Sequence, residues 1–352
     1  MRAFVITAPG DAGVQDVPAP TAAPGEVVVE VARAGVCGTD AEFFNGSMAY
    51  LHDGQASFPV RIGHEWAGVV RSVGPGVDRD WMGRRVTGDT MLGCGTCRRC
   101  RAGSHNVCVS RVEVGISHGR PGALAEQVAI PAVALRALPD TVDDAMGAMV
   151  EPGGNAVRAV RGAAVPPGGR LLVLGAGTIG LLAAMFARAG GIDVHIVGRS
   201  ARSLAIARSL GFASVWTDDT LPDVPWDGVI DASNAPALPA RALDLVEPGK
   251  RVVYIGLAPE WSPIDTRALA LKDVTAVGIL GGSQGLDRAI EAYARGDVDP
   301  RPLIAATVDL DRLVEVLAGD RPVTATDGPK VHVQTRGDHP GPRNPAQKER
   351  FA

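Results

Sequence analysis

The five cysteines of this chain divide into a group of four and a single distant one. The four occur within the stretch CGTCRRCRAGSHNVC, as Cys94, Cys97, Cys100 and Cys108. Four thiolates on a short Gly-containing loop can surround one ion, which is the arrangement of a tetrahedral structural zinc. Because the chain shows no secretion signal, clustered Cys-x2-Cys pairs favour metal over disulfides. We therefore predict a structural zinc lobe at residues 93–109.

A second set of residues has the donor atoms of a catalytic zinc site, which needs about three protein ligands and an open position for substrate. Its thiolate, imidazole and carboxylate donors are Cys37, His64, Glu65 and Glu151. Two residues beside the cysteine have supporting chemistry, since Thr39 could pass on a proton from a bound alcohol and Asp40 could orient a ligand. A lone Cys is more often a small hydrophobic residue, so only the combination with a cofactor site makes this prediction specific.

The cofactor site is predicted from glycines that directly follow the apolar run RLLVL. The segment is Gly175-Ala176-Gly177-Thr178-Ile179-Gly180. Alone, Gly-x-Gly-x-x-Gly can be a tight turn without a ligand. Between a strand and a helix it is typical of dinucleotide binding, because the backbone can approach a pyrophosphate at the helix N-terminus.

The residues after the next strand bear on which dinucleotide binds. An NAD site usually has an acid about 20 residues past the glycines, where it accepts from the ribose 2′-hydroxyl. This chain has Gly198, Arg199 and Ser200 there, and Asp193 lies too early. Arg199 and Ser200 can donate to a 2′-phosphate and Arg202 could add charge, so we predict NADP in preference to NAD. The alternative is that these arginines are solvated surface charges.

Two kinds of structure must position these residues. Residues 1 to about 150 contain short Val-rich runs between Pro and Gly turns, which predicts β structure with no helix beyond a turn after Cys37. From about Glu151 strands and helices alternate, as in a parallel sheet wound by right-handed crossovers. The expected strands of this part are 170–174, 194–197, 228–231, 251–255 and 274–279, and the expected helices are 181–189, 202–210 and 236–245.

The C-terminal part is expected to return to the β-rich part. A helix at 286–295, a strand at 303–308 and a helix at 310–317 precede a strand at 330–334, which we expect to rejoin the first sheet. The last residues, 336–352, are rich in Pro, Gly and charge and are predicted to be disordered.

Length and composition limit the class of protein. A chain of 352 residues favours two domains, and 46% hydrophobic residues with only 4% aromatic suit helices packed closely on a parallel sheet. The net charge of −4 and the lack of a basic run predict no nucleic-acid partner. The apolar stretch 171–187 contains the three fingerprint glycines, so we predict a strand, turn and helix there and no membrane span. A cytoplasmic protein is expected.

These motifs, in this order, resemble the zinc-dependent medium-chain dehydrogenases, which include alcohol, sorbitol, threonine and glucose dehydrogenases. The resemblance extends to about residue 335. It implies an α/β protein with a GroES-like β-rich catalytic domain at 1–152 and 290–335, and a Rossmann doubly wound parallel-sheet domain at 153–289. It also implies two zinc ions per chain. Cys37 and His64 would hold the catalytic ion, with Glu65 and Glu151 binding it directly, occasionally or through water, and His105 would be a loop residue of a lobe already filled by thiolates.

One position departs from much of this family. Many alcohol, sorbitol and threonine branches have a His five residues after the catalytic Cys, whereas this chain has Glu42. The surrounding sequence to Asn45, and the later Glu113-Val-Gly-Ile, resemble the glucose dehydrogenase branch. That resemblance implies that Glu42, Asn45 and Glu113 contact a sugar. The alternative is that Glu42 and Glu113 are surface carboxylates.

The expected function is hydride transfer between a sugar, polyol or secondary alcohol and NADP. One alternative is an NAD-dependent polyol or secondary-alcohol dehydrogenase. Another is a non-catalytic, zinc-stabilised protein that binds NADPH. The expected partners are a small-molecule substrate and further copies of the chain, in a homodimer or homotetramer that pairs through the last Rossmann strand at 274–279.

Overall fold

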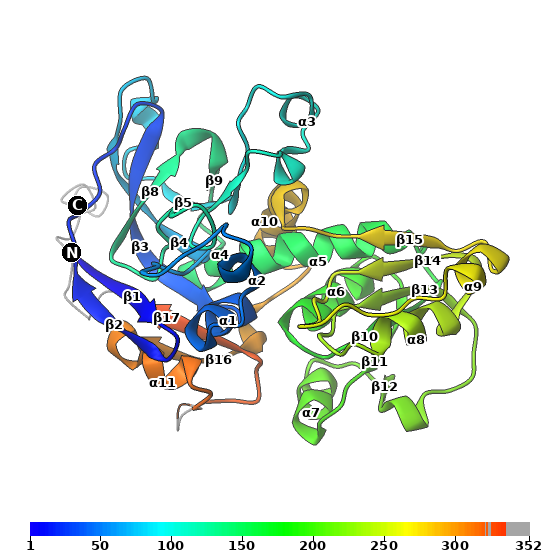
Figure 1. The fold of residues 1–352 in the computed structure, drawn as a ribbon. Coiled ribbons are helices and arrows are strands. Elements are labelled where there is room, and N and C mark those ends of the chain that lie inside the picture. Colours follow the sequence, from blue (N-terminus) through cyan, green and yellow to red (C-terminus); the bar gives the residue numbers. More distant parts are fainter. Residues whose placement is uncertain (321, 323–324, 336–352) are drawn as a thin grey trace, which may run out of the picture.

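Two bodies make up the protein, each built on its own sheet (Figure 1). The computed structural model describes residues 1–320, 322 and 325–335, so the tail predicted to be disordered lies outside the described residues. The N-terminal body has a mainly antiparallel sheet, and the middle of the chain forms a parallel one. Helix α5 (Val150–Ala163) lies where the two bodies meet and contacts both sheets.

The first body contains a seven-stranded sheet in the order β16-β17-β3-β4-β5-β9, with β8 also paired to β3. Buried valines of its central strands, such as Val29 and Val70, pack with Phe4 and Trp66 in one apolar core. The strands are β3 (Glu26–Val36), β4 (Glu65–Val73), β5 (Arg85–Gly88), β8 (Gln127–Pro131), β9 (Leu135–Ala137), β16 (Ile304–Asp309) and β17 (Lys330–Gln334). Two smaller ribbons are β1 (Arg2–Ala8) with β2 (Asp11–Asp16), and β6 (Met91–Leu92) with β7 (Val112–Glu113).

The prediction that this body has no helix beyond a turn was wrong. Its helices before residue 150 are α1 (Gly38–Asn45), α2 (Ala49–His52), α3 (Arg98–Arg101) and α4 (Asp144–Ala148). Each is too short to show apolar periodicity in the sequence. Helix α1 is set by its cap instead, because the Asp40 carboxylate accepts a hydrogen bond from the backbone N–H of Cys37.

The second body is a doubly wound parallel sheet in the order β12-β11-β10-β13-β14-β15, which confirms the predicted fold class. Its strands are β10 (Arg170–Leu174), β11 (Asp193–Val197), β12 (Val215–Trp216), β13 (Trp226–Asp231), β14 (Val246–Tyr254) and β15 (Thr275–Gly278). Its further helices are α6 (Thr178–Ala189), α7 (Ala201–Ser209), α8 (Leu238–Leu245) and α9 (Thr266–Leu271). Leu171 and Val173 pack toward α5 and α6, whereas Leu172 and Leu174 pack toward α8, so both faces are covered.

The end of the described chain returns to the first sheet. After α10 (Leu286–Arg295) and α11 (Leu313–Leu317), strand β17 inserts between β16 and β3. It pairs antiparallel with β3, with Val331 opposite Val36. This pairing brings Lys330 next to the segment that leads into Cys37. Among the described residues, no helix is both long and apolar enough to cross a membrane.

Candidate active site

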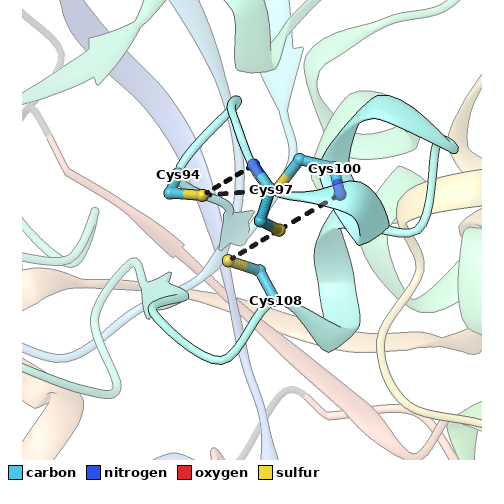
Figure 2. Close-up of side chains that lie close together, drawn as sticks. All are labelled: Cys94, Cys97, Cys100 and Cys108. Carbon is cyan, nitrogen blue, oxygen red and sulfur yellow. Dashed lines mark hydrogen bonds between the residues drawn. The ribbon is translucent and has the colours of Figure 1, made fainter.

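The four lobe cysteines converge on one point (Figure 2), with their sulfur atoms within 4.8 Å of one another. The Sγ atoms of Cys94 and Cys100 are 3.9 Å apart, and those of Cys97 and Cys108 are 3.8 Å apart. Zinc–sulfur bonds of about 2.3 Å in a tetrahedron separate the sulfurs by about 3.8 Å. The spacing of these four residues therefore fits a zinc ion.

Backbone amides in this lobe favour thiolates. The N–H of Cys97 donates to Cys94 Sγ and the N–H of Cys100 donates to Cys97 Sγ, each over 3.4 Å. The Thr96 hydroxyl and neighbouring amides lower the pKa of Cys94 to about 6, while loss of water contact raises the pKa of Cys100 to about 12. Four thiolates can occupy this space together only with a cation among them, which is a further indication of a metal site.

The lobe is fastened to the chain that follows the parallel sheet. His105 Nε2 lies 2.7 Å from Asp89 Oδ2, and the Ser283 hydroxyl donates to the other oxygen of Asp89 over 2.9 Å. The Asn106 amide donates to the carbonyl of Leu280 over 2.9 Å. His105 is thus occupied by a carboxylate and links the lobe to residues just beyond β15.

A second group of donors forms where β3 leads into α1. Ligand atoms of Cys37, His64 and Glu65 lie within 4.8 Å of one another. Cys37 is the N-cap of α1, while Glu65 begins β4 and pairs with Gly35 of β3. A Cβ on Gly35 would lie 2.1 Å from Glu65 Oε2, so a side chain there would displace the Glu65 carboxylate. Strand pairing therefore brings the Gly-His-Glu motif to the cysteine.

Asp40 lies behind the imidazole of His64. Its Oδ1 is 3.9 Å from His64 Nδ1, and both atoms are buried without a hydrogen-bond partner among the described residues. Burial alone would lower the pKa of His64, but the Cys37 thiol and the Asp40 carboxylate raise it well above its usual value. Two buried polar atoms of this group thus lack partners among the described residues, so the group has room for a further ligand such as a metal ion. An acid behind a histidine is also the arrangement that orients a metal ligand.

Lys330 is a buried residue at this site that the sequence analysis missed. Its Nζ donates to both oxygens of Glu65 over 2.7 Å and to the carbonyl of Val36 over 2.9 Å. Burial would lower the pKa of Lys330, but the charges of Glu65 and Cys37 raise it overall. Glu65 therefore has a cationic partner independently of any metal. The available signal was a lysine opening the apolar strand 330–334.

Glu151 lies in the first turn of α5 and is buried. It is not among the three donors that lie within 4.8 Å, and its Oε1 accepts from the Asn155 amide over 2.8 Å. Burial raises the pKa of Glu151 to about 7, while the charge of His64 opposes this shift. The Glu151 carboxyl group thus interacts electrostatically with His64. Its role as a metal ligand stays a prediction.

The glycine segment forms the turn between β10 and α6. Gly175 has φ +104°, and a Cβ on Gly180 would lie 1.9 Å from the carbonyl oxygen of Gly175. By contrast, a Cβ on Gly177 would meet nothing within 4 Å. Gly177 is the N-cap of α6, whose first turn contains Thr178 and Ile179. The helix N-terminus therefore faces open space that suits a pyrophosphate.

The segment after β11 has one basic side chain available. Arg199 is exposed, and it forms no hydrogen bond or ion pair with the residues that the structure describes. The Ser200 hydroxyl accepts from the N–H of Ser203 and caps α7, and Gly198 is buried before it. Arg202, suggested as additional charge for the ribose, instead donates to the carbonyl of Gly328 over 2.9 Å.

The predicted proton carrier and two of the predicted substrate residues lie on α1. Thr39 is half-buried in its first turn, two residues after Cys37. Glu42 is exposed, although partial loss of water contact raises the pKa of its carboxyl group above the usual value. Asn45 is exposed, and its side-chain oxygen accepts from the N–H of Ser47 over 2.9 Å, which closes the turn after the helix.

The third predicted substrate residue, Glu113, is buried and already paired. Arg111 Nε donates to its Oε1 over 2.7 Å, and the Tyr50 hydroxyl donates to the same oxygen over 3.1 Å. Sequence reasoning missed Tyr50 and Arg111 as members of this cluster. Contact between Glu113 and a substrate hydroxyl stays a prediction, and the carboxylate would have to share its existing partners.

Comparison with known proteins agrees with this arrangement. Residues 23–140 match the alcohol dehydrogenase GroES-like domain, and residues 178–295 match the zinc-binding dehydrogenase domain. L-threonine 3-dehydrogenase of Rhizobium etli strain CIAT 652 is 31% identical over 311 residues, covering 84% of this chain and 88% of that protein. L-threonine 3-dehydrogenase of Saccharopolyspora erythraea is 34% identical over 293 residues, covering 80% and 84%.

Solved structures give the same result. A zinc-binding dehydrogenase of Sinorhizobium meliloti 1021 bound to NADP has a TM-score of 0.85 at 27% identity, covering 95% of this chain and 99% of that one. An alcohol dehydrogenase of E. coli CFT073 complexed with NADH has a TM-score of 0.86 at 26% identity, with the same coverage. Fold and site together define a two-domain oxidoreductase with a dinucleotide site. The chain belongs to the zinc-dependent medium-chain dehydrogenase superfamily, in its alcohol and polyol dehydrogenase family.

Proposed function

We propose that this protein oxidises a polar alcohol, such as a sugar, a polyol or another secondary alcohol, with hydride transfer to NADP. The observation that carries the proposal is the grouping of half-buried Cys37 with buried His64 and Glu65, in a chain whose glycine turn leaves a helix N-terminus open. A protein that only sensed NADPH would have no use for a second metal-binding donor group.

Residues of the chain would bind the metal ion and transfer the proton of the substrate. When bound, zinc would polarise the alcohol oxygen and the nicotinamide would accept the hydride. Cys37 and His64, with Glu65 or Glu151, would hold the ion. Thr39 lies in the same helical turn as the cysteine and would relay the proton of the substrate hydroxyl, accepting it at Oγ1 while its own hydroxyl proton passes on toward solvent. The interface of the two bodies would exclude water from the reacting atoms.

The preference for NADP is supported by Arg199, which is exposed at the end of the second Rossmann strand where an NAD site would have an acid. We expect Arg199→Asp to lower the ratio of kcat/KM for NADP to kcat/KM for NAD by at least about tenfold, because a charge-assisted contact to the phosphate becomes a repulsion. Steady-state kinetics with both cofactors measures this ratio.

A matched control is Arg202→Gln. Arg202 is bonded to the Gly328 carbonyl, so its loss should leave the cofactor ratio within about twofold. If the ratio stays the same or rises in Arg199→Asp, the assignment of the 2′-phosphate to Arg199 is wrong.

The second candidate function is an NAD-dependent polyol or secondary-alcohol dehydrogenase. It is favoured by the names of the relatives, L-threonine 3-dehydrogenases, and by a solved neighbour that binds NADH. A turnover screen of sugars, polyols, L-threonine and apolar secondary alcohols with each cofactor separates the two. Strong activity on apolar alcohols alone would remove the polar-substrate proposal.

A further inference from the structure

A charged cluster of Tyr50, Arg111 and Glu113 lies on a segment that packs against the Gly63–His64 segment of the catalytic body. Tyr50 comes from α2, Glu113 ends β7, and Arg111 precedes that strand. Arg111 Nε donates to Glu113 Oε1 over 2.7 Å and Arg111 Nη2 donates to the Tyr50 oxygen over 3.0 Å. The Tyr50 hydroxyl donates to Glu113 over 3.1 Å, so the three side chains close a ring of hydrogen bonds.

This ring is joined to the catalytic donors through short contacts. Gly115, two residues after Glu113, packs on the residue before His64, since a Cβ there would lie 2.5 Å from the carbonyl oxygen of Gly63. The Thr90 hydroxyl donates to the carbonyl of His64 over 3.1 Å, and the N–H of Val114 donates to the carbonyl of Thr90 over 3.0 Å. The segment that contains Arg111 and Glu113 is therefore fixed against the His64 segment.

The side chains of this cluster differ in which hydrogen-bonding atoms remain available to a ligand. Glu113 is 3% exposed and its carboxylate already accepts from Arg111 and Tyr50. The Arg111 side chain is 24% exposed, and its hydrogen bonds to Glu113 and Tyr50 use Nε and Nη2. No described residue accepts a hydrogen bond from Arg111 Nη1. The guanidinium plane is thus fixed by two partners while one edge keeps its donors.

A guanidinium fixed in this way suits one class of ligand. Its remaining N–H groups form a planar fork, which carboxylates and phosphates match with two parallel hydrogen bonds. A neutral hydroxyl offers no such pair of acceptors. Glu113 offsets the charge of Arg111. The guanidinium would therefore select a ligand mainly through the direction of its hydrogen bonds, and less through net charge. The ligand that fits is an anionic group carried by the molecule being oxidised.

We propose that Arg111 binds an anionic group of the alcohol substrate, a carboxylate or a phosphate ester, and that Glu113 and Tyr50 hold its guanidinium in place. The inference rests on the proposed dehydrogenase function and narrows its substrate class. Glu113 then acts as a positioning residue, in place of a direct contact to sugar hydroxyls.

Matched pairs of alcohols test the proposal in the zinc-loaded, full-length enzyme. One pair is 3-hydroxybutanoate and butane-1,3-diol, and the other is sorbitol 6-phosphate and sorbitol, so that the two pairs distinguish carboxylate from phosphate. We expect wild type to prefer the anionic member of at least one pair by about tenfold or more in kcat/KM. Arg111→Gln should raise KM for that member by about tenfold or more, with less than a threefold change for its neutral partner. Arg111→Lys should recover part of the loss.

Two further variants make the result specific. Glu113→Gln should raise KM for the anionic member and leave kcat within about twofold, because it releases the guanidinium without touching the reacting atoms. Arg71→Gln, which removes an ion pair of 2.7 Å between exposed Arg71 on β4 and Glu30 on β3, should change KM for neither alcohol. If neutral alcohols are oxidised as well as their anionic partners, or Arg111→Gln affects both members equally, the inference is wrong while the dehydrogenase function stands. If no alcohol is oxidised with either cofactor, the proposed function itself fails, and the inference with it.

Discussion

Glu151 is the buried carboxyl group whose ionisation most directly links this site to stability. Burial raises its pKa from about 4.5 to about 7. Below about pH 4.5 the group is protonated in both the folded and the unfolded chain. Between these two values the unfolded chain has lost the proton and the folded one keeps it, so rising pH favours unfolding. The stability that the protonated Glu151 side chain retains at low pH is therefore lost as pH rises through about 7.

This shift predicts a pH-dependent difference between two metal-free proteins. From about pH 5 to about pH 8, we expect the free energy of unfolding of the wild type to fall by about 2.5 kcal/mol relative to that of Glu151→Gln. Urea unfolding with a chelator present measures it. A relative change below about 1 kcal/mol would contradict the buried, uncharged state of this side chain.

Residue type and spacing pointed to the seven side chains that the structure gathers in two donor groups, because each of them belongs to a short motif. Lys330 and Arg111 could not be found in that way. Lys330 pairs with Glu65 across 265 positions of sequence, and Arg111 pairs with Tyr50 across 61. An isolated Lys or Arg has many possible environments, and only the strand order β17-β3-β4 gives Lys330 its partner.

At the scale of elements, two glycines in the turn between β10 and α6 have different roles, one in cofactor binding and the other in folding. Gly177→Asp should leave stability unchanged or slightly higher, because the position is open and Asp is a good N-cap. Its charge should raise the Kd for NADP by at least about tenfold through repulsion of the pyrophosphate. Gly180→Ala should cost at least about 2 kcal/mol of stability, since its Cβ would lie 1.9 Å from a carbonyl oxygen.

Thermal unfolding and fluorescence titration with NADPH measure the two effects. Tight NADPH binding by Gly177→Asp would show that the pyrophosphate does not lie at the N-terminus of α6. An unchanged melting temperature for Gly180→Ala would show that the turn is looser than the structure indicates.

Most strands and helices of the parallel sheet could be predicted from apolar runs, and β10, α10 and β17 have the predicted bounds. Helix α5 could not, because Pro152, Gly153 and Gly154 oppose a helix on local propensity. Tertiary packing decides its structure. A Cβ on Gly153 would lie 2.3 Å from the Tyr293 hydroxyl, and one on Gly154 would lie 2.7 Å from the Gly282 carbonyl oxygen. These glycines are required by close contacts that only the fold creates.

At the scale of the whole molecule, one edge of the parallel sheet is exposed. β15 is the last strand in the order, and its residues Thr275 and Ala276 are exposed. Nearby Leu271 is 73% exposed. An open edge of this kind is a template for pairing with another strand. We propose that a second copy pairs there, which gives a dimer or a dimer of dimers.

Light scattering after gel filtration tests this assembly. We expect the wild type to have an even number of subunits and Ala276→Lys to have a lower mass, because lysine on an edge strand opposes pairing. A monomeric wild type, or a mass that Ala276→Lys does not change, would mean that this edge is not the interface.

Elemental analysis of zinc determines whether the chain holds a catalytic metal besides a structural one. We predict two zinc ions per chain in the wild type. Cys37→Ser should keep one zinc and the wild-type fold, and should lose alcohol oxidation. One zinc per chain in the wild type that survives Cys37→Ser would contradict the account, and would indicate a zinc-stabilised NADPH-binding protein without catalysis.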